Sequence, residues 1–175
     1  MGGHSFGYAA SMTERPASLE ALHRHLADLR DGVHGGAGTR RDKERLFERT
    51  VTLLDPVASR VLAEVDDDLL LGSGRVEATG VVRTRDVGVQ ALWTLTWPDQ
   101  QRAGLPPVEL RAHFEASFHH PHLRGTTVGD WPLNVFDEAD AEGQLPVLRV
   151  IAAADVHNLV YRSDWSLIPA ARSEH

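Results

Sequence analysis

Apolar residues recur at helical spacing through the first third of the chain. A stripe with steps of three and four residues predicts an amphipathic helix that begins after Ser18 and ends at Gly35-Gly36. The stripe consists of Leu19, Leu22, Leu26, Leu29 and Val33. Two further helices are predicted at 41–55 and 56–65, because the Asp-Pro pair between them is typical of a helix start. We expect the apolar faces of these helices to pack toward the core.

The hydrophobic pattern changes to period two after residue 74. Alternation predicts strands at 75–83 and 87–97, joined as a hairpin through residues 84–86, and a third strand at 108–118. In this third strand the even-numbered residues are apolar and the odd-numbered residues are polar. One face of the strand is therefore predicted to lie in the core and the other to face solvent.

The last third of the chain has a less regular pattern. Residues 119–145 have the composition of a loop, and a loop of that length in a compact domain suggests a functional role, such as bordering a pocket. Apolar runs predict two more strands at 147–154 and 159–168. Residues 150–160 also have a periodicity compatible with a helix, so the two alternatives stay open here.

Helices in succession followed by strands in succession predict an α+β fold. We expect N-terminal amphipathic helices packed on a curved, mainly antiparallel β-sheet, either cone-like or a small barrel with a helical lid. A single domain is predicted over 17–170, with disordered tails at 1–16 and 171–175. Residues 1–11 are Gly-rich and unpatterned, and are interpreted as a vector-derived or extended start.

Composition excludes several classes of function. The 175 residues include no cysteine, which excludes disulfides, thiolate metal sites and a catalytic thiol. A chain of this length buries enough apolar surface to fold without a metal, so a bound metal would serve function. The net charge of −7, with basic residues scattered among acids, argues against a nucleic acid partner. With neither a 20-residue apolar stretch nor a signal peptide, we expect no membrane partner and a cytoplasmic location.

Histidines are the most unusual chemical feature of the sequence, because four of the ten fall within ten residues. Histidine beside a carboxylate is suited to acid–base catalysis near neutral pH. The leading hypothesis is therefore an enzyme of the isomerase, cyclase or lyase type that acts on a small molecule. The candidate catalytic residues are His113, Glu115, His119, His120, Asp155 and His157. The candidate ligand-binding residues are Arg111 and Arg124, for an anionic group, and Trp93 and Trp131, for an apolar one.

Two alternatives use other features. In the first, His120 and His122 point to the same side of an extended segment and, with His119, bind zinc, iron, manganese or copper. In the second, the domain is a noncatalytic ligand-binding or accessory subunit, and homodimerisation is compatible with its size. His23 and His25 are expected on a solvated helix exterior, and His34 beside the glycines is given no role.

Overall fold

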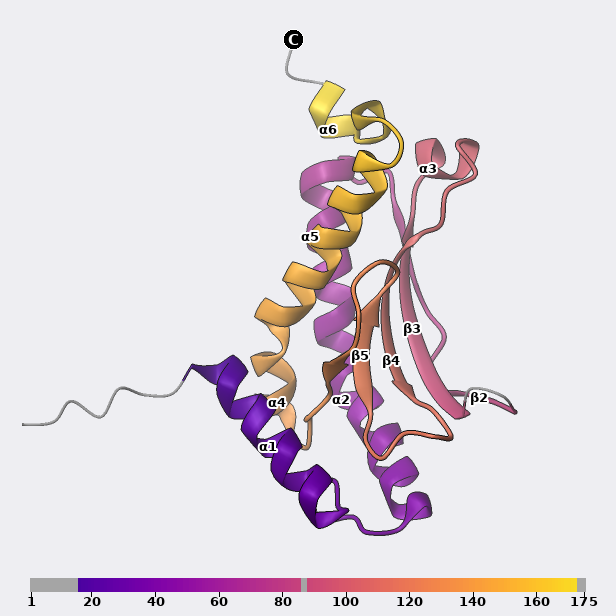
Figure 1. The fold of residues 1–175 in the computed structure, drawn as a ribbon. Coiled ribbons are helices and arrows are strands. Elements are labelled where there is room, and N and C mark those ends of the chain that lie inside the picture. The colour runs from indigo at the N-terminus through magenta and orange to yellow at the C-terminus, as the bar shows by residue number, and fades with distance from the viewer. Residues whose placement is uncertain (1–15, 86–87, 173–175) are drawn as a thin grey trace, which may run out of the picture.

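The computed structural model describes residues 16–85 and 88–172, and these form a two-layer α+β domain. Figure 1 shows α2 (Arg40–Val65) and α5 (Leu145–Tyr161) side by side against the sheet, with α1 (Ala17–Asp31) toward one end of the molecule. The strands are β1 (Arg75–Ala78), β2 (Val82–Thr84), β3 (Gly88–Thr96), β4 (Val108–Phe114), β5 (His122–Gly125) and β6 (Trp131–Pro132). Shorter helical elements are a π-helical turn (Asp66–Leu70), α3 (Pro98–Arg102), α4 (Glu138–Gly143), a 3-10 turn (Trp165–Leu167) and α6 (Pro169–Arg172).

The sheet is antiparallel throughout and open at both edges. Its order is β1-β3-β4-β5-β6, and β2 also pairs with β3. The predicted strand at 75–83 is thus an edge strand, interrupted at residues 79–81, that forms a hairpin with β3. Residues 86–87 of the predicted hairpin link and second strand lie outside the described residues. The sheet has six strands where five were predicted, and it does not close into a barrel.

The core lies between one face of the sheet and the α2–α5 layer. In β4 the even-numbered residues are fully buried, as the alternation predicts, and β3 contributes Trp93 and Leu95 beside them. Phe47 and Leu54 of α2 and Leu148 of α5 are 0% exposed. β4 ends at Phe114, four residues earlier than predicted. A turn follows because Arg40 donates hydrogen bonds to the carbonyls of Phe114, Glu115 and Phe118.

A single helix, α2, replaces the two helices predicted at 41–55 and 56–65. Pro56 lies inside it and lacks the N–H that would bond one turn back. Loss of one backbone hydrogen bond is outweighed by the burial of apolar residues on both sides, which include Leu54, Val57 and Val61. The Asp-Pro pair is therefore not a helix boundary here.

The strands predicted at 147–154 and 159–168 are wrong, and the helical alternative is confirmed. Helix α5 covers all of the first segment and residues 159–161 of the second, and it buries Leu148, Ile151, Ala152 and Leu159, which share one helical face. The apolar run is nearly continuous, so its period is poorly defined by sequence. The segment predicted as a loop at 119–145 contains β5, β6 and α4.

Helix α1 is rotated about its axis relative to the predicted orientation. Its four leucines are exposed by 37–52%, whereas His25 is its buried residue. The inward face instead consists of Ala21, His25 and Asp28, which follow each other by four and three residues. This rotation brings two polar side chains of α1 into the interior.

Candidate functional site

Five histidines, four of them buried and one half-buried, form a continuous group that we call the histidine cluster. It comprises His25 on α1, His34 in the α1–α2 loop, His113 on β4, His120 just before β5, and His122 on β5. Ring centroids are 5.5 Å apart for His34 and His120, 5.0 Å for His120 and His25, 5.5 Å for His25 and His122, and 6.0 Å for His122 and His113. The fold therefore joins three of the four clustered histidines of the sequence to two that appeared unrelated.

The loop that holds His34 requires its glycines. Gly35 and Gly36 have φ values of 52° and 81°, in the region that glycine favours, and the backbones of His34 and Ala37 pair across them. A Cβ on Gly35 would lie 2.3 Å from the Phe136 ring. The Gly35 N–H donates to Asp28 Oδ2 at 3.3 Å, which ties the loop to α1. The pair predicted as a helix end thus fixes a histidine beside a carboxylate.

Asp28, His34 and His120 present three potential metal ligands to one point. Their ligand atoms lie within 4.8 Å of one another, and both histidines are 1% exposed. Ligands at about 2.1 Å from a tetrahedral zinc ion lie about 3.4 Å apart, so small side-chain rotations would bring these three into coordination. Two imidazoles and one carboxylate suit zinc, iron or manganese.

The hydrogen bonding of His120 favours metal coordination. Its Nε2–H donates to the Val33 carbonyl at 2.7 Å, which leaves the lone pair on Nδ1, and Nδ1 has no hydrogen-bond partner among the described residues. A backbone carbonyl that fixes the tautomer of a ligating histidine is the usual arrangement around metals. The same part of the chain leaves both ring nitrogens of His34, and Nδ1 of His25 and His122, without a hydrogen bond.

Burial favours the neutral form of four of the five histidines. Burial, together with the neighbouring His120 and Lys43, lowers the pKa of His34 from 6.5 to about 3. Burial also lowers the pKa of His122 to about 4, and lowers the pKa values of His25 and His120. Neutral imidazole is the form that binds metals, so the site is in its binding form at neutral pH.

Lys43 joins the two segments that carry the candidate ligands. Its buried ammonium donates to the carbonyls of Gly32 at 2.9 Å and His119 at 3.2 Å, next to His34 and His120 in the chain. A cavity of about 360 Å³ borders it, lined in part by Arg40 and Phe118. The cavity is positively charged on one side and approaches the segments that hold the ligands.

His113 lies at the other end of the cluster and is 1% exposed, so its prediction on a solvated strand face is wrong. The loop after β4 covers it, with the Phe118 ring centroid 5.6 Å away. Its Nδ1 is 3.3 Å from Glu115, the partner that the sequence suggested. Its Nε2 is 2.8 Å from Asp130, which sequence reasoning missed because 17 residues separate the two. His113 is thus held between two carboxylates.

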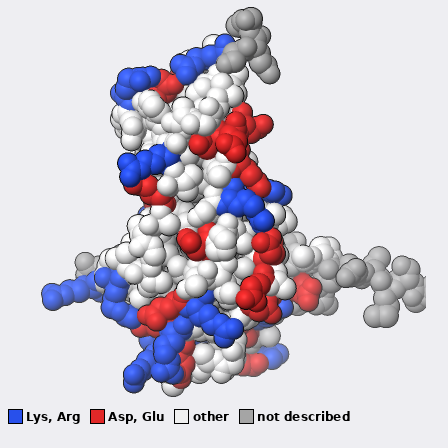
Figure 2. Space-filling model, turned by 180° about the vertical axis from the view of Figure 1, so that it is seen from behind, with Lys and Arg blue, Asp and Glu red and all other residues white. Residues whose placement is uncertain are grey.

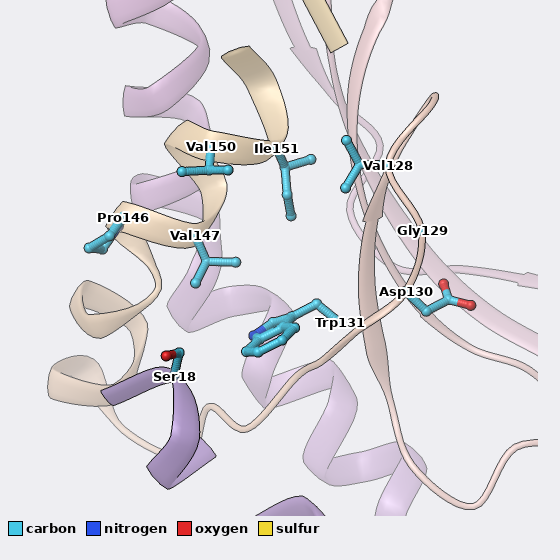
Figure 3. Close-up of a pocket in the computed structure, with 9 residues that line it drawn as sticks. All are labelled: Ser18, Val128, Gly129, Asp130, Trp131, Pro146, Val147, Val150 and Ile151. Carbon is cyan, nitrogen blue, oxygen red and sulfur yellow. The ribbon is translucent and has the colours of Figure 1, made fainter. Parts of the chain in front are cut away.

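An apolar groove of about 570 Å³ lies beside this end of the cluster. Figure 3 shows Trp131, Val147 and Ile151 around it, with Ser18 at its lower edge. The Asp130 carboxylate points away from the groove in the same view. Trp131, predicted to bind a ligand, is therefore part of a cavity wall.

Three predicted catalytic residues lie outside the cluster. His119 is exposed, and His157 is exposed on α5, where it stacks on Tyr161. Asp155 is buried and accepts hydrogen bonds from the backbone N–H groups of Thr126 at 2.6 Å and Thr127 at 2.8 Å. Positions two apart on a helix face different directions, so Asp155 and His157 do not form the predicted pair. Asp155 holds the turn after β5.

The remaining predicted ligand-binding residues also have structural partners. Arg111 bonds to Glu109 at 2.8 Å and lies opposite Arg124 in the β4–β5 register, so the sheet brings the two arginines together. Trp93 is 1% exposed and its indole N–H donates to Asp55 at 2.7 Å. Trp93 is therefore part of the core and not of a pocket wall.

Sequence reasoning missed Asp28, His34, His25 and Asp130. One signal was present: His25 and Asp28 are three residues apart on the predicted helix, so they lie on the same side of it. The convergence of His34 with His120 has no local signal, because it depends on how the α1–α2 loop meets the segment before β5.

Comparisons with protein families, curated proteins and solved structures found no match. Within residues 16–85 and 88–172, no helix is long and apolar enough to cross a membrane. On the face shown in Figure 2, acidic and basic side chains are interspersed, without a large field of one sign. The candidate site must therefore be interpreted from its own chemistry.

Proposed function

We propose that this protein is a metal-dependent enzyme that acts on a small molecule, with a divalent transition-metal ion bound by Asp28, His34 and His120. One observation carries the proposal: a carboxylate and two fully buried imidazoles converge, and both ring nitrogens of His34 and Nδ1 of His120 lack hydrogen-bond partners in the described part of the chain. A buried polar atom without a partner costs about 1–3 kcal/mol. A metal ion would satisfy several of these atoms at once.

Three protein ligands suggest a catalytic role for the ion. Structural zinc sites use four protein ligands, whereas catalytic sites keep a position for water or substrate. The cavity bordered by Lys43 lies beside the segments that carry His34 and His120, and it is the space that we propose for a small substrate. This set shares only His120 with the ligands that the sequence suggested.

Metal titration of single variants distinguishes the two ligand sets. We expect zinc to bind the wild type with one ion per chain, and His34→Ala or Asp28→Asn to weaken binding by at least about 100-fold. His119→Ala should bind like the wild type, because His119 is exposed. Cobalt provides a second readout, since a tetrahedral cobalt site absorbs visible light and the spectrum should disappear in His34→Ala. Failure of zinc, iron, manganese and cobalt to bind the wild type would refute the proposal.

A further inference from the structure

The only lysine of the chain carries a buried amine that is not a ligand in the proposed metal site. Among the 18 lysines and arginines of the sequence, Lys43 is the single lysine, and it is 6% exposed. An arginine side chain stays protonated in proteins, whereas the amine of lysine can also act as a nucleophile. The chain therefore has arginine at its other permanently charged basic positions and places its one side-chain amine in the interior.

The hydrogen bonds of Lys43 are compatible with a nucleophilic amine. In the described part of the chain its Nζ donates only to backbone carbonyls, those of Gly32 at 2.9 Å and His119 at 3.2 Å, and it forms no ion pair there. A neutral amine has two N–H groups and one lone pair. The two carbonyls can accept both N–H groups, which leaves the lone pair available for attack on an electrophile.

A cavity borders this amine and has room for a small molecule. Its volume is about 360 Å³, and Lys43 lines it together with the aromatic rings of Phe114 and Phe118. Gly32 and Gly38 also line the cavity, and a Cβ at either glycine would meet no atom within 4 Å. A desolvated amine at the wall of a partly apolar cavity is an arrangement in which enzymes activate lysine.

We propose that Lys43 binds an aldehyde or a ketone covalently in this cavity, as a Schiff base. The lone pair of the neutral amine forms a bond to the carbonyl carbon. The carbonyl oxygen then leaves as water with the two amine protons, and a C=N bond remains. The proposal rests on the proposed function only in assigning the cavity to the substrate, because formation of the imine needs no metal ion.

Reductive trapping with butanal and sodium cyanoborohydride tests the proposal, in protein freed of metal by a chelator. Reduction converts the imine into a stable butyl amine, and peptide mass spectrometry shows whether the butyl group is on Lys43 or on the N-terminal amine. An ordinary lysine reacts more slowly than an N-terminal amine, because less of it is neutral at about pH 7. We expect the reverse in the folded protein, with Lys43 labelled at least about tenfold faster. The preference should disappear in urea. Labelling of Lys43 at or below the rate of the N-terminal amine overturns the proposal.

Two glycine variants test whether the cavity directs the reaction. Gly38→Leu fills part of the cavity without a backbone clash. Gly143→Leu is the matched control, because a Cβ there also meets no atom within 4 Å and Gly143 lines a different pocket. Labelling of Lys43 should slow about tenfold in Gly38→Leu alone, while labelling of the N-terminal amine stays constant in both variants. Equal labelling of Lys43 in the two variants would overturn the assignment to this cavity.

Zinc titration of the same protein distinguishes failure of this proposal from failure of the proposed function. Rapid trapping at Lys43 without zinc binding would refute only the metal site. Zinc binding with slow trapping would refute only the Schiff base, and would leave Lys43 as a structural link between the segments that carry His34 and His120.

Discussion

The two-layer core and the histidine cluster are both hidden from solvent, but they are held by different forces. In the core, Phe47 and Leu54 are 0% exposed, and their removal from water directly favours folding. In the cluster, His34 and His120 are just as buried, yet they carry polar nitrogens without hydrogen bonds to any described residue. Burial stabilises the first region and destabilises the second. Regions that oppose stability in this way are expected at functional sites, which supports the proposed metal site.

The largest expected difference between the two regions is in how acid affects their contribution to the free energy of unfolding. The pKa values of His34 and His122 lie near 3 and 4, below their ordinary value of 6.5, so the unfolded chain takes up these protons before the folded one does. The contribution of these two histidines is complete above pH 6.5 and is lost as the pH falls toward 4. For two protons, the free energy of unfolding should decrease by about 2.7 kcal/mol per pH unit in that window.

Urea unfolding of metal-free protein at a series of pH values measures this slope. His34→Gln should reduce it by about 1.4 kcal/mol per pH unit, because one titrating group is removed. A flat profile between pH 6.5 and 4.5 would contradict the neutral state of the cluster.

Truncation in the core should cost nearly as much, without the pH dependence. Phe47→Ala removes a fully buried ring between α2 and the sheet, and we expect a loss of about 3–5 kcal/mol in the free energy of unfolding. The loss should be equal at pH 7.5 and pH 6. A loss that varies with pH would mean that the core and the cluster are coupled.

Zinc should stabilise the protein through the cluster, and it should not restore the stability lost in the core variant Phe47→Ala. At 100 times its dissociation constant, zinc should raise the free energy of unfolding of the wild type by about 2.7 kcal/mol. The same increment is expected in Phe47→Ala, whereas His34→Ala should show none. Thermal melts with and without zinc, with a chelator control, provide the measurement, and an equal gain in His34→Ala would exclude the proposed ligands.

The smallest effects concern residues that the sequence placed in one site with the histidines. Asp155→Asn should cost about 1–2 kcal/mol, because it weakens the bonds from Thr126 and Thr127. His157→Ala should change stability by less than about 0.5 kcal/mol, since the side chain is exposed. Neither variant should alter the zinc affinity. A large loss of affinity in either one would support the site that was predicted from the sequence.

The difference between the regions also explains what could be predicted from sequence. The β3 and β4 strands have strict alternation, so their core faces were predicted correctly, and the antiparallel α+β class followed. The apolar run at 147–154 was misread because it lacks a polar face that would reveal its period. A cone-like sheet stays a prediction, and so does the helical lid that was expected over a small barrel.

The candidate site was only partly predictable, because its parts converge through long-range contacts. The histidine-rich segment was correctly singled out, and the pairing of His113 with Glu115 is observed. Its other partners depend on the packing of α1, whose leucines were expected to point inward. A periodic stripe indicates that a helix face will be covered, but not that the same domain will cover it.

The inward face of α1 has a consequence for local motion. His25 is the buried residue of this helix. The helix is held to the rest of the domain by polar contacts: Asn134 donates a hydrogen bond to the Ala21 carbonyl at 3.1 Å, and Arg24 lies 3.5 Å from Asp140. An element held this way opens at lower free energy than the global transition, so its amide hydrogens should exchange ahead of those of α2. Any ion that bridges Asp28 to His34 and His120 would slow that exchange. The rate of amide exchange in α1 therefore reports whether an ion is bound at the site, and it can be measured without knowledge of the substrate.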